Sequence, residues 1–109
     1  MTNVEKLLIK LGANTAHKGF RYLSRAVELA RDDPGTMQSY MKTLLPMVAA
    51  EFNATASSVE RCIRTTIIRI YDSNPEIPPE FTPNSMYGAV TSKDFINRTI
   101  LATEDERSV

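Results

Sequence analysis

The apolar residues of this chain recur at helical rather than strand spacing. The first group shares one helical face and comprises Val4, Leu7, Leu8 and Leu11. Thr2 and Glu5 have the spacing of a capping box, and Gly12 is a favoured residue directly after a helix. The pattern predicts a first helix that begins after Thr2 and ends before Gly12.

The next segments have the same spacing. A second helix is predicted from about Lys18 to Arg31, and the run DDPG at 32–35 ends it. Its apolar stripe consists of Phe20, Leu23, Val27 and Ala30. The apolar residues of a third segment are Met37, Tyr40, Met41, Leu44 and Leu45. Pro46 then separates two short helices, because proline interrupts a helix but suits its first turn.

Two further helices are predicted at 47–53 and from about Thr55 or Ser57 to Tyr71. The stretch 73–90 contains four of the six prolines and predicts an irregular segment, either an ordered connection or an extended arm. A last helix begins near Ser92, and the terminal ATEDERSV is predicted to be a frayed tail. No segment alternates with period two. The predicted fold class is therefore all-α, a compact bundle of about five to six helices in one domain spanning 1–109.

Within this bundle, residues 47–71 have a helix-turn-helix pattern. In the string VAAEFNATASSVERCIR, Ala49 is small enough for two helices to approach closely. Asn53 stands where the turn needs a left-handed backbone, which asparagine tolerates. Val59 and Ile63 follow one helical turn apart. The pattern alone leaves open a DNA-binding unit and a purely structural hairpin.

The long helix of this unit carries candidate base-reading side chains. At about 100° per residue, Arg61 and Arg64 project together, away from the apolar stripe. A guanidinium offers two coplanar donors that match the O6 and N7 acceptors of guanine. Glu60 either accepts from a cytosine amine or caps the helix with Ser57 in an S-x-x-E arrangement. The competing interpretation is that Arg61 and Arg64 only form a charged, solvent-exposed face of the helix.

These motifs resemble the C-terminal DNA-binding domain of the stage-zero sporulation protein A family of response regulators. The resemblance is carried by TASSVERCIR at 55–64, by LLP and the A-x-x-[FY]-N stretch before it, by LG at 11–12, by KGFRYLSRAVE at 18–28 and by SKDFI at 92–96. It implies a six-helix domain that binds short promoter boxes, commonly as head-to-tail pairs, and contacts the sigma subunit of RNA polymerase. It also implies that Glu60, Arg61 and Arg64 read bases.

A second set of residues is expected to contact the DNA backbone or flank the bases. Its members are Ser57, Ser58, Thr65, Thr55, His17, Lys18, Arg21 and Arg25. His17 and Lys18 stand just before or at the start of a helix, where free N–H groups favour phosphate. An exposed turn histidine without this role remains the alternative for His17.

The chain also departs from the family. Ser58 stands where the family usually has Arg, and Thr65 stands where it usually has His. His17 lies one position later than the histidine that the family usually has before K-G. Ile68, on the outer side of the helix, replaces a charged residue and is a candidate contact for a neighbouring element or a second subunit. The arm at 73–90 does not match the penultimate helix. The chain is either a fragment of a two-domain regulator or a free-standing paralogue without a receiver domain.

Composition narrows the function classes. The 13 basic and 13 acidic residues cancel, but they are unevenly distributed. Residues 1–31 carry six basic and two acidic side chains, residues 32–71 carry four and four, and residues 72–109 carry three and seven, or +4, 0 and −4. This asymmetry suits a basic face for an anionic partner. No apolar run is long enough for a membrane span.

The few reactive residues point away from catalysis. One Cys and one His exclude a four-ligand zinc site, and no phosphate loop or paired-carboxylate motif occurs. We therefore expect no enzyme activity, cofactor, metal, membrane or small-molecule substrate, and a cytoplasmic, nucleoid-associated bacterial protein. Cys62, Met37, Met41 and Met47 are expected in the core, and Phe81 and Tyr87 are expected to pin the arm. The alternative function is a helical protein-interaction module that keeps the helix-turn-helix as scaffold.

Overall fold

The computed structural model describes residues 2–82 and 90–107, and side chains as far as Glu104. These ranges contain five α-helices and no strand, so the all-α prediction is confirmed. The helices are α1 (Asn3–Lys10), α2 (Lys18–Asp32), α3 (Leu45–Glu51), α4 (Ala56–Ser73) and α5 (Ser92–Arg107).

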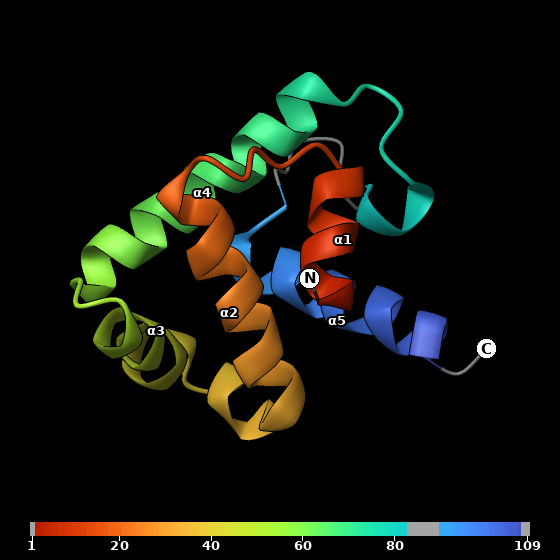
Figure 1. Ribbon diagram of the computed structural model, residues 1–109. Coiled ribbons are helices and arrows are strands. Elements are labelled where there is room, and N and C mark those ends of the chain that lie inside the picture. Colours follow the sequence, from red (N-terminus) through yellow and green to blue (C-terminus); the bar gives the residue numbers. More distant parts are fainter. Residues whose placement is uncertain (1, 83–89, 108–109) are drawn as a thin grey trace.

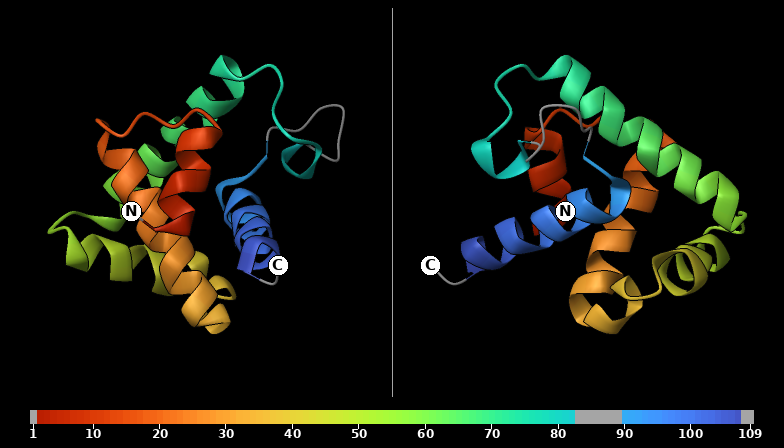
Figure 2. Two further views of the ribbon diagram at one scale, coloured as in Figure 1. Left: turned by 45° about the vertical axis from the view of Figure 1, so that its right-hand side comes forward. Right: turned by 180° about the vertical axis from the view of Figure 1, so that it is seen from behind.

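Helix α2 is the centre of the bundle and packs against each of the other four helices. α4 crosses its N-terminal end, α3 lies beside its middle, and α1 flanks it on the other side (Figure 1). Seen from behind, α5 closes the bundle against α1, α2 and α4 (Figure 2). The shared core includes fully buried Leu8, Leu23, Val27, Ile63 and Phe95. The apolar stripes read from the sequence meet in this core.

The predicted starts and ends of the first helices are confirmed. The Thr2 side chain accepts from the Glu5 N–H and the Glu5 carboxylate accepts from the Thr2 N–H, which completes the capping box of α1. Gly12 has φ +109°, a left-handed conformation that suits glycine. Near the other end of the chain, the Thr91 hydroxyl accepts from the Asp94 N–H and so caps the start of α5.

The segment before α3 differs from the regular helix predicted. Pro34–Met37 forms a 3₁₀ turn, and Tyr40–Leu44 is a π-helix that runs directly into α3. Pro46 has no N–H to donate to the Lys42 carbonyl, and the wider π turn precedes it. Irregular backbone changes which side chains point inward. Met37 is buried, but Met41 is 60% exposed and Met47 39%, so the core prediction was wrong for these two.

As far as Thr82, the chain after α4 forms an ordered connection, one of the two alternatives expected. α4 continues to Ser73, and a 3₁₀ turn at Pro79–Phe81 buries the Phe81 ring beside Phe95, with ring centroids 5.4 Å apart. The Tyr71 hydroxyl donates to the Phe81 carbonyl, and Arg98 donates to the carbonyls of Glu80 and Thr82. The prediction that Phe81 pins the arm is confirmed, whereas Tyr87 lies outside the described residues.

The predicted frayed tail was wrong for most of its length. α5 continues through the predicted tail to Arg107. Thr103 is fully buried and its hydroxyl donates to the Ile100 carbonyl, which satisfies this inward polar group. Ala102 and Thr103 pack against the bundle at this end of α5.

Candidate nucleic-acid interface

Helices α3 and α4 are joined by a tight turn with the geometry of a helix-turn-helix unit. Asn53 has φ +54°, the left-handed conformation expected at this position. The Ala54 N–H donates back to the Ala49 carbonyl over 2.9 Å, which closes the turn. Ala49 itself is 5% exposed, so its small side chain allows the close approach of the two helices.

The first turn of α4 is capped by Thr55. Its hydroxyl accepts from the Ser58 N–H over 3.1 Å, and Ser57 is exposed without this capping role. The capping alternative for Glu60 and Ser57 is therefore not the arrangement found. The Glu60 carboxylate instead accepts from Arg64 Nη1 over 3.0 Å, one helical turn later.

The two long faces of α4 have different environments. Val59, Ile63, Ile67 and Ile70 are buried in the core. On the opposite face Arg61, Arg64 and Thr65 are exposed, and the Arg64 side chain keeps 57% of its surface accessible. The structure thus brings together the two arginines that the sequence placed on one face.

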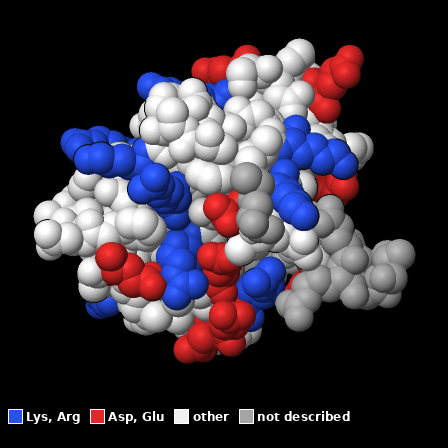
Figure 3. All heavy atoms as spheres, in the orientation of Figure 1, with Lys and Arg blue, Asp and Glu red and all other residues white. Residues whose placement is uncertain are grey.

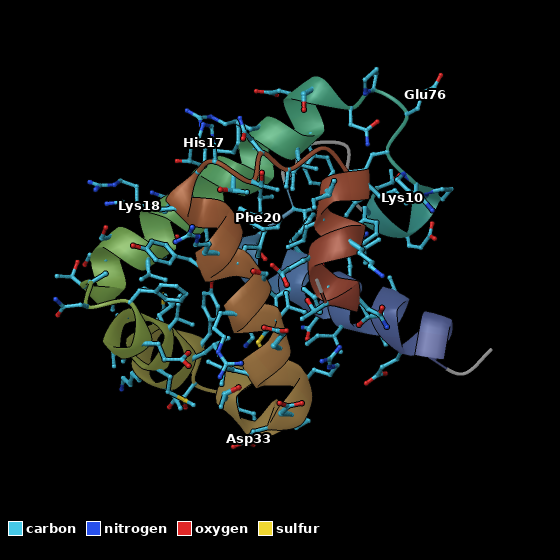
Figure 4. All side chains as sticks on the ribbon, in the orientation of Figure 1. Lys10, His17, Lys18, Phe20, Asp33 and Glu76 are labelled. Atoms are coloured by element: carbon cyan, nitrogen blue, oxygen red, sulfur yellow. The ribbon has the colours of Figure 1, made fainter. Side chains whose placement is uncertain are left out.

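The N-terminus of α2 lies directly against this helix. A Cβ added to Gly19 would lie 1.9 Å from Thr66 Oγ1 and 2.5 Å from the Cys62 carbonyl oxygen, so only glycine allows this approach. The contact brings exposed His17 and Lys18 beside α4 (Figure 4). A groove of about 390 Å³ follows the seam. Its polar lining includes His17, Lys18, Arg61, Thr65 and Arg69.

Positive charge gathers at this seam. Lys and Arg atoms cluster on the side of the molecule where α2 begins beside α4 (Figure 3). Three cations, Lys18, Arg61 and Arg69, border the one groove. Because like charges raise the local potential, the seam suits an extended anion.

A comparison with known families bears on the interpretation of this unit. Residues 4–100 match the family described as sporulation initiation factor Spo0A C terminal. The chain belongs to this family. It is a DNA-binding, transcription-regulating effector domain of a sporulation response regulator, and the resemblance read from the sequence is confirmed.

One side chain of this Spo0A-family domain was missed by sequence analysis. Arg69 is exposed on α4, and its Nη1 lies 2.7 Å from His17 Nδ1 and 3.3 Å from Nε2. The signal was present, because residues 61, 65 and 69 follow each other at intervals of one helical turn. The neighbouring groove of about 420 Å³ is also lined by His17 and Arg69.

Arg25 is engaged within the domain. Its Nε donates to both carboxylate oxygens of Glu51, over 3.0 and 2.9 Å, and so joins α2 to α3. The hydrogen bond to Glu51 raises the pKa of Arg25 above its ordinary value. Arg21, one turn earlier on α2, is exposed, and no salt bridge involves it within the described ranges. Of the two arginines expected at the DNA backbone, Arg21 is the more available.

The structure also shows the surroundings of Ile68, a departure from the family pattern, and of Cys62. Ile68 is 48% exposed, as its outward position predicted, and lines a groove of about 400 Å³ with Tyr40 and Val90. Cys62 is half-buried against the core, in agreement with a packing role. Among the side chains described, those of residues 2–82 and 90–104, no group of three acidic, His or Cys residues is placed to hold a metal ion. Of the helices in these ranges, none is both long and apolar enough to cross a bilayer.

Proposed function

We propose that this domain reads a short promoter box by inserting α4 into the major groove of DNA. The observation that carries the proposal is the pair Arg61 and Arg64, exposed one turn apart on the outer face of the second helix of the helix-turn-helix unit. Each guanidinium can donate two hydrogen bonds to one guanine, and one such contact discriminates between bases by about 1–3 kcal/mol. Two arginines in this register read neighbouring base pairs.

Glu60 completes the base-reading set. Its salt bridge holds Arg64 on the outer face before DNA arrives, which lowers the entropy lost on binding. On DNA, a carboxylate at this position can accept from the N4 amine of cytosine, the partner of a guanine contacted by Arg64. Glu60 therefore contributes both the orientation of Arg64 and a contact of its own.

The flanking residues fix the register on the duplex. Thr55, Ser57, Ser58 and Thr65 lie on α4 or at its start, and His17, Lys18 and Arg21 at the start of α2. Hydroxyl groups, cations and free helix N–H groups bind phosphate oxygens without reading sequence. Because Arg25 is held by Glu51, we assign it to the α2–α3 connection instead.

The proposed assembly follows from the small size of the reading surface. One recognition helix contacts few base pairs, so selectivity within a genome needs a second copy on an adjacent box. The proposal includes tandem binding and contact with the sigma subunit of RNA polymerase, as the resemblance read from the sequence implies. The proposed place of action is the bacterial cytoplasm, at the nucleoid.

A fluorescence-anisotropy titration tests the proposal. The chain is titrated against a duplex selected from random sequence by repeated binding and against a scrambled duplex of equal length and composition, at several salt concentrations. A specific domain binds the selected duplex at least about a thousand times more tightly. Equal, weak binding to both would favour the alternative, a protein-interaction module that keeps the helix-turn-helix as scaffold.

A further inference from the structure

The contact between Arg69 and His17 is chemically unusual for this protein. Arg25, Arg64 and Arg98 each bind a carboxylate, respectively Glu51, Glu60 and Asp94. Arg69 contacts an imidazole instead, with no salt bridge among the described residues. The guanidinium is thus held in place without neutralisation of its charge.

The position of this contact explains what can neutralise the charge. Arg69 borders the same groove as Lys18 and Arg61, at the seam where Gly19 brings α2 against α4. Lys18 and Arg61 are exposed. A group with a delocalised negative charge and several acceptor oxygens would satisfy cations on both helices at once.

We propose that Arg69 binds a phosphate of the DNA backbone and that His17 acts as its positioning residue. This inference rests on the proposed function, because it places the phosphate beside an α4 that is seated in the major groove. His17 accepts from Arg69 through Nδ1 and fixes the direction of the guanidinium, so that less side-chain entropy is lost when the phosphate arrives. The DNA footprint then extends along α4 beyond Arg64 by one phosphate.

The first test is the salt dependence of binding by Arg69→Ala. Loss of one phosphate contact makes the plot of log K against log salt shallower by about 0.9. Between roughly 50 and 200 mM salt, the wild-type affinity therefore falls about 3.5-fold more than that of the variant. The matched control is Lys10→Ala, an exposed cation on α1, away from His17 and Lys18 (Figure 4). Its slope stays at the wild-type value.

The second test separates positioning from direct contact by His17. If His17 acts through Arg69, then His17→Ala weakens binding, His17→Gln restores it with a neutral acceptor, and the double variant with Arg69→Ala binds no more weakly than Arg69→Ala alone. Additive losses would overturn the positioning role. Circular dichroism and urea unfolding confirm that each variant is folded.

The measurements distinguish a failure of this inference from a failure of the proposed function. Phosphate contacts act on any sequence, so the slope of Arg69→Ala is measured on both the selected and the scrambled duplex. An unchanged slope on both duplexes overturns the role of Arg69, whatever the base preference of the domain. If the wild type binds the selected and scrambled duplexes equally, base reading is refuted. The change in salt slope caused by Arg69→Ala still reports the phosphate contact in that case.

Discussion

Gly19 of α2 lies against the backbone of Cys62 in α4, so closely that a Cβ at Gly19 would be 2.5 Å from the Cys62 carbonyl oxygen. The obstacle is backbone and therefore cannot rotate away. This approach sets the distance between the start of α2 and the proposed reading helix, and it creates the seam that His17, Lys18 and Arg69 border.

Replacing Gly19 by Ala should accordingly force the two helices apart. Overpacking of this kind costs about 1–3 kcal/mol of unfolding free energy, which urea denaturation measures. DNA affinity should fall as well, because the seam opens. Gly35→Ala is the comparison, since its nearest neighbour, 3.2 Å away, is the Asp33 side chain. A Gly19→Ala protein as stable as the wild type would refute the close contact.

Base reading by α4 predicts a particular result for Arg61→Ala and Arg64→Ala. Each should weaken binding to the preferred box by about 1–3 kcal/mol and flatten the preference at one base pair. Folding should change little, because both side chains are exposed. Selection of binding sites from random duplexes measures the preference. An unchanged consensus with the double variant would refute recognition by this face.

Lys18 and Arg25 were expected in one class from the sequence, and the structure separates them. Lys18→Ala should weaken all duplexes alike and make the salt slope shallower by about 0.9. Arg25→Ala should leave the slope unchanged and lower stability by at most about 1 kcal/mol, since the pair with Glu51 is partly exposed. A shallower slope for Arg25→Ala would show that Arg25 exchanges Glu51 for phosphate.

The contrast between Lys18 and Arg25 shows which structural features can be predicted from the sequence. Helix starts and turns depend on neighbours, so the capping box at Thr2 and the left-handed Asn53 were predicted correctly. The partner of Arg25 lies 26 residues away, and that of Arg69 lies 52 away. No local pattern encodes such contacts, because they depend on how α2 crosses α3 and α4.

The π-helix shows that prediction from the sequence can also fail within a single element. Periodicity assumes 3.6 residues per turn, and the wider turn at Tyr40–Leu44 shifts every side chain relative to that expectation. Met41 is therefore exposed, although it belongs to an apolar stripe when the segment is drawn as an α-helix.

The same segment buries the Tyr40 hydroxyl, which makes no well-formed hydrogen bond among the described residues. Tyr40 is 9% exposed, and its Oη is near Ser92 without a hydrogen bond of acceptable geometry within the described ranges. Burial raises the pKa of Tyr40 from 10 to about 12. The unfolded chain then ionises first, so stability is full below pH 10 and falls as the pH rises from 10 to about 12.

Tyr40→Phe should therefore be neutral or stabilise the protein by up to about 1 kcal/mol, because it removes an unsatisfied group. It should also reduce the loss of stability above pH 10. Urea unfolding across alkaline pH measures both effects. Tyr71→Phe is the contrasting variant, since it removes the hydrogen bond to the Phe81 carbonyl and should cost about 1 kcal/mol. Marked destabilisation by Tyr40→Phe would show that its hydroxyl is satisfied in solution.

The last prediction concerns assembly on DNA. We expect a monomer or weak dimer in free solution, since the helices show no long heptad seam. A second copy should join cooperatively on two adjacent boxes. Ile68 is a candidate contact, because it is 48% exposed beside Arg64 in the groove that Val90 also lines.

Sedimentation velocity with one-box and two-box duplexes measures this cooperativity. Ile68→Glu, which restores a charged residue, should reduce the preference for two-box DNA while leaving one-box affinity close to the wild-type value. The spacing between the boxes provides the control, because a shift of half a helical turn places the second domain on the opposite side of the duplex and removes protein contact. A tight dimer without DNA, or independent filling of the two boxes at every spacing, would contradict pairing on DNA.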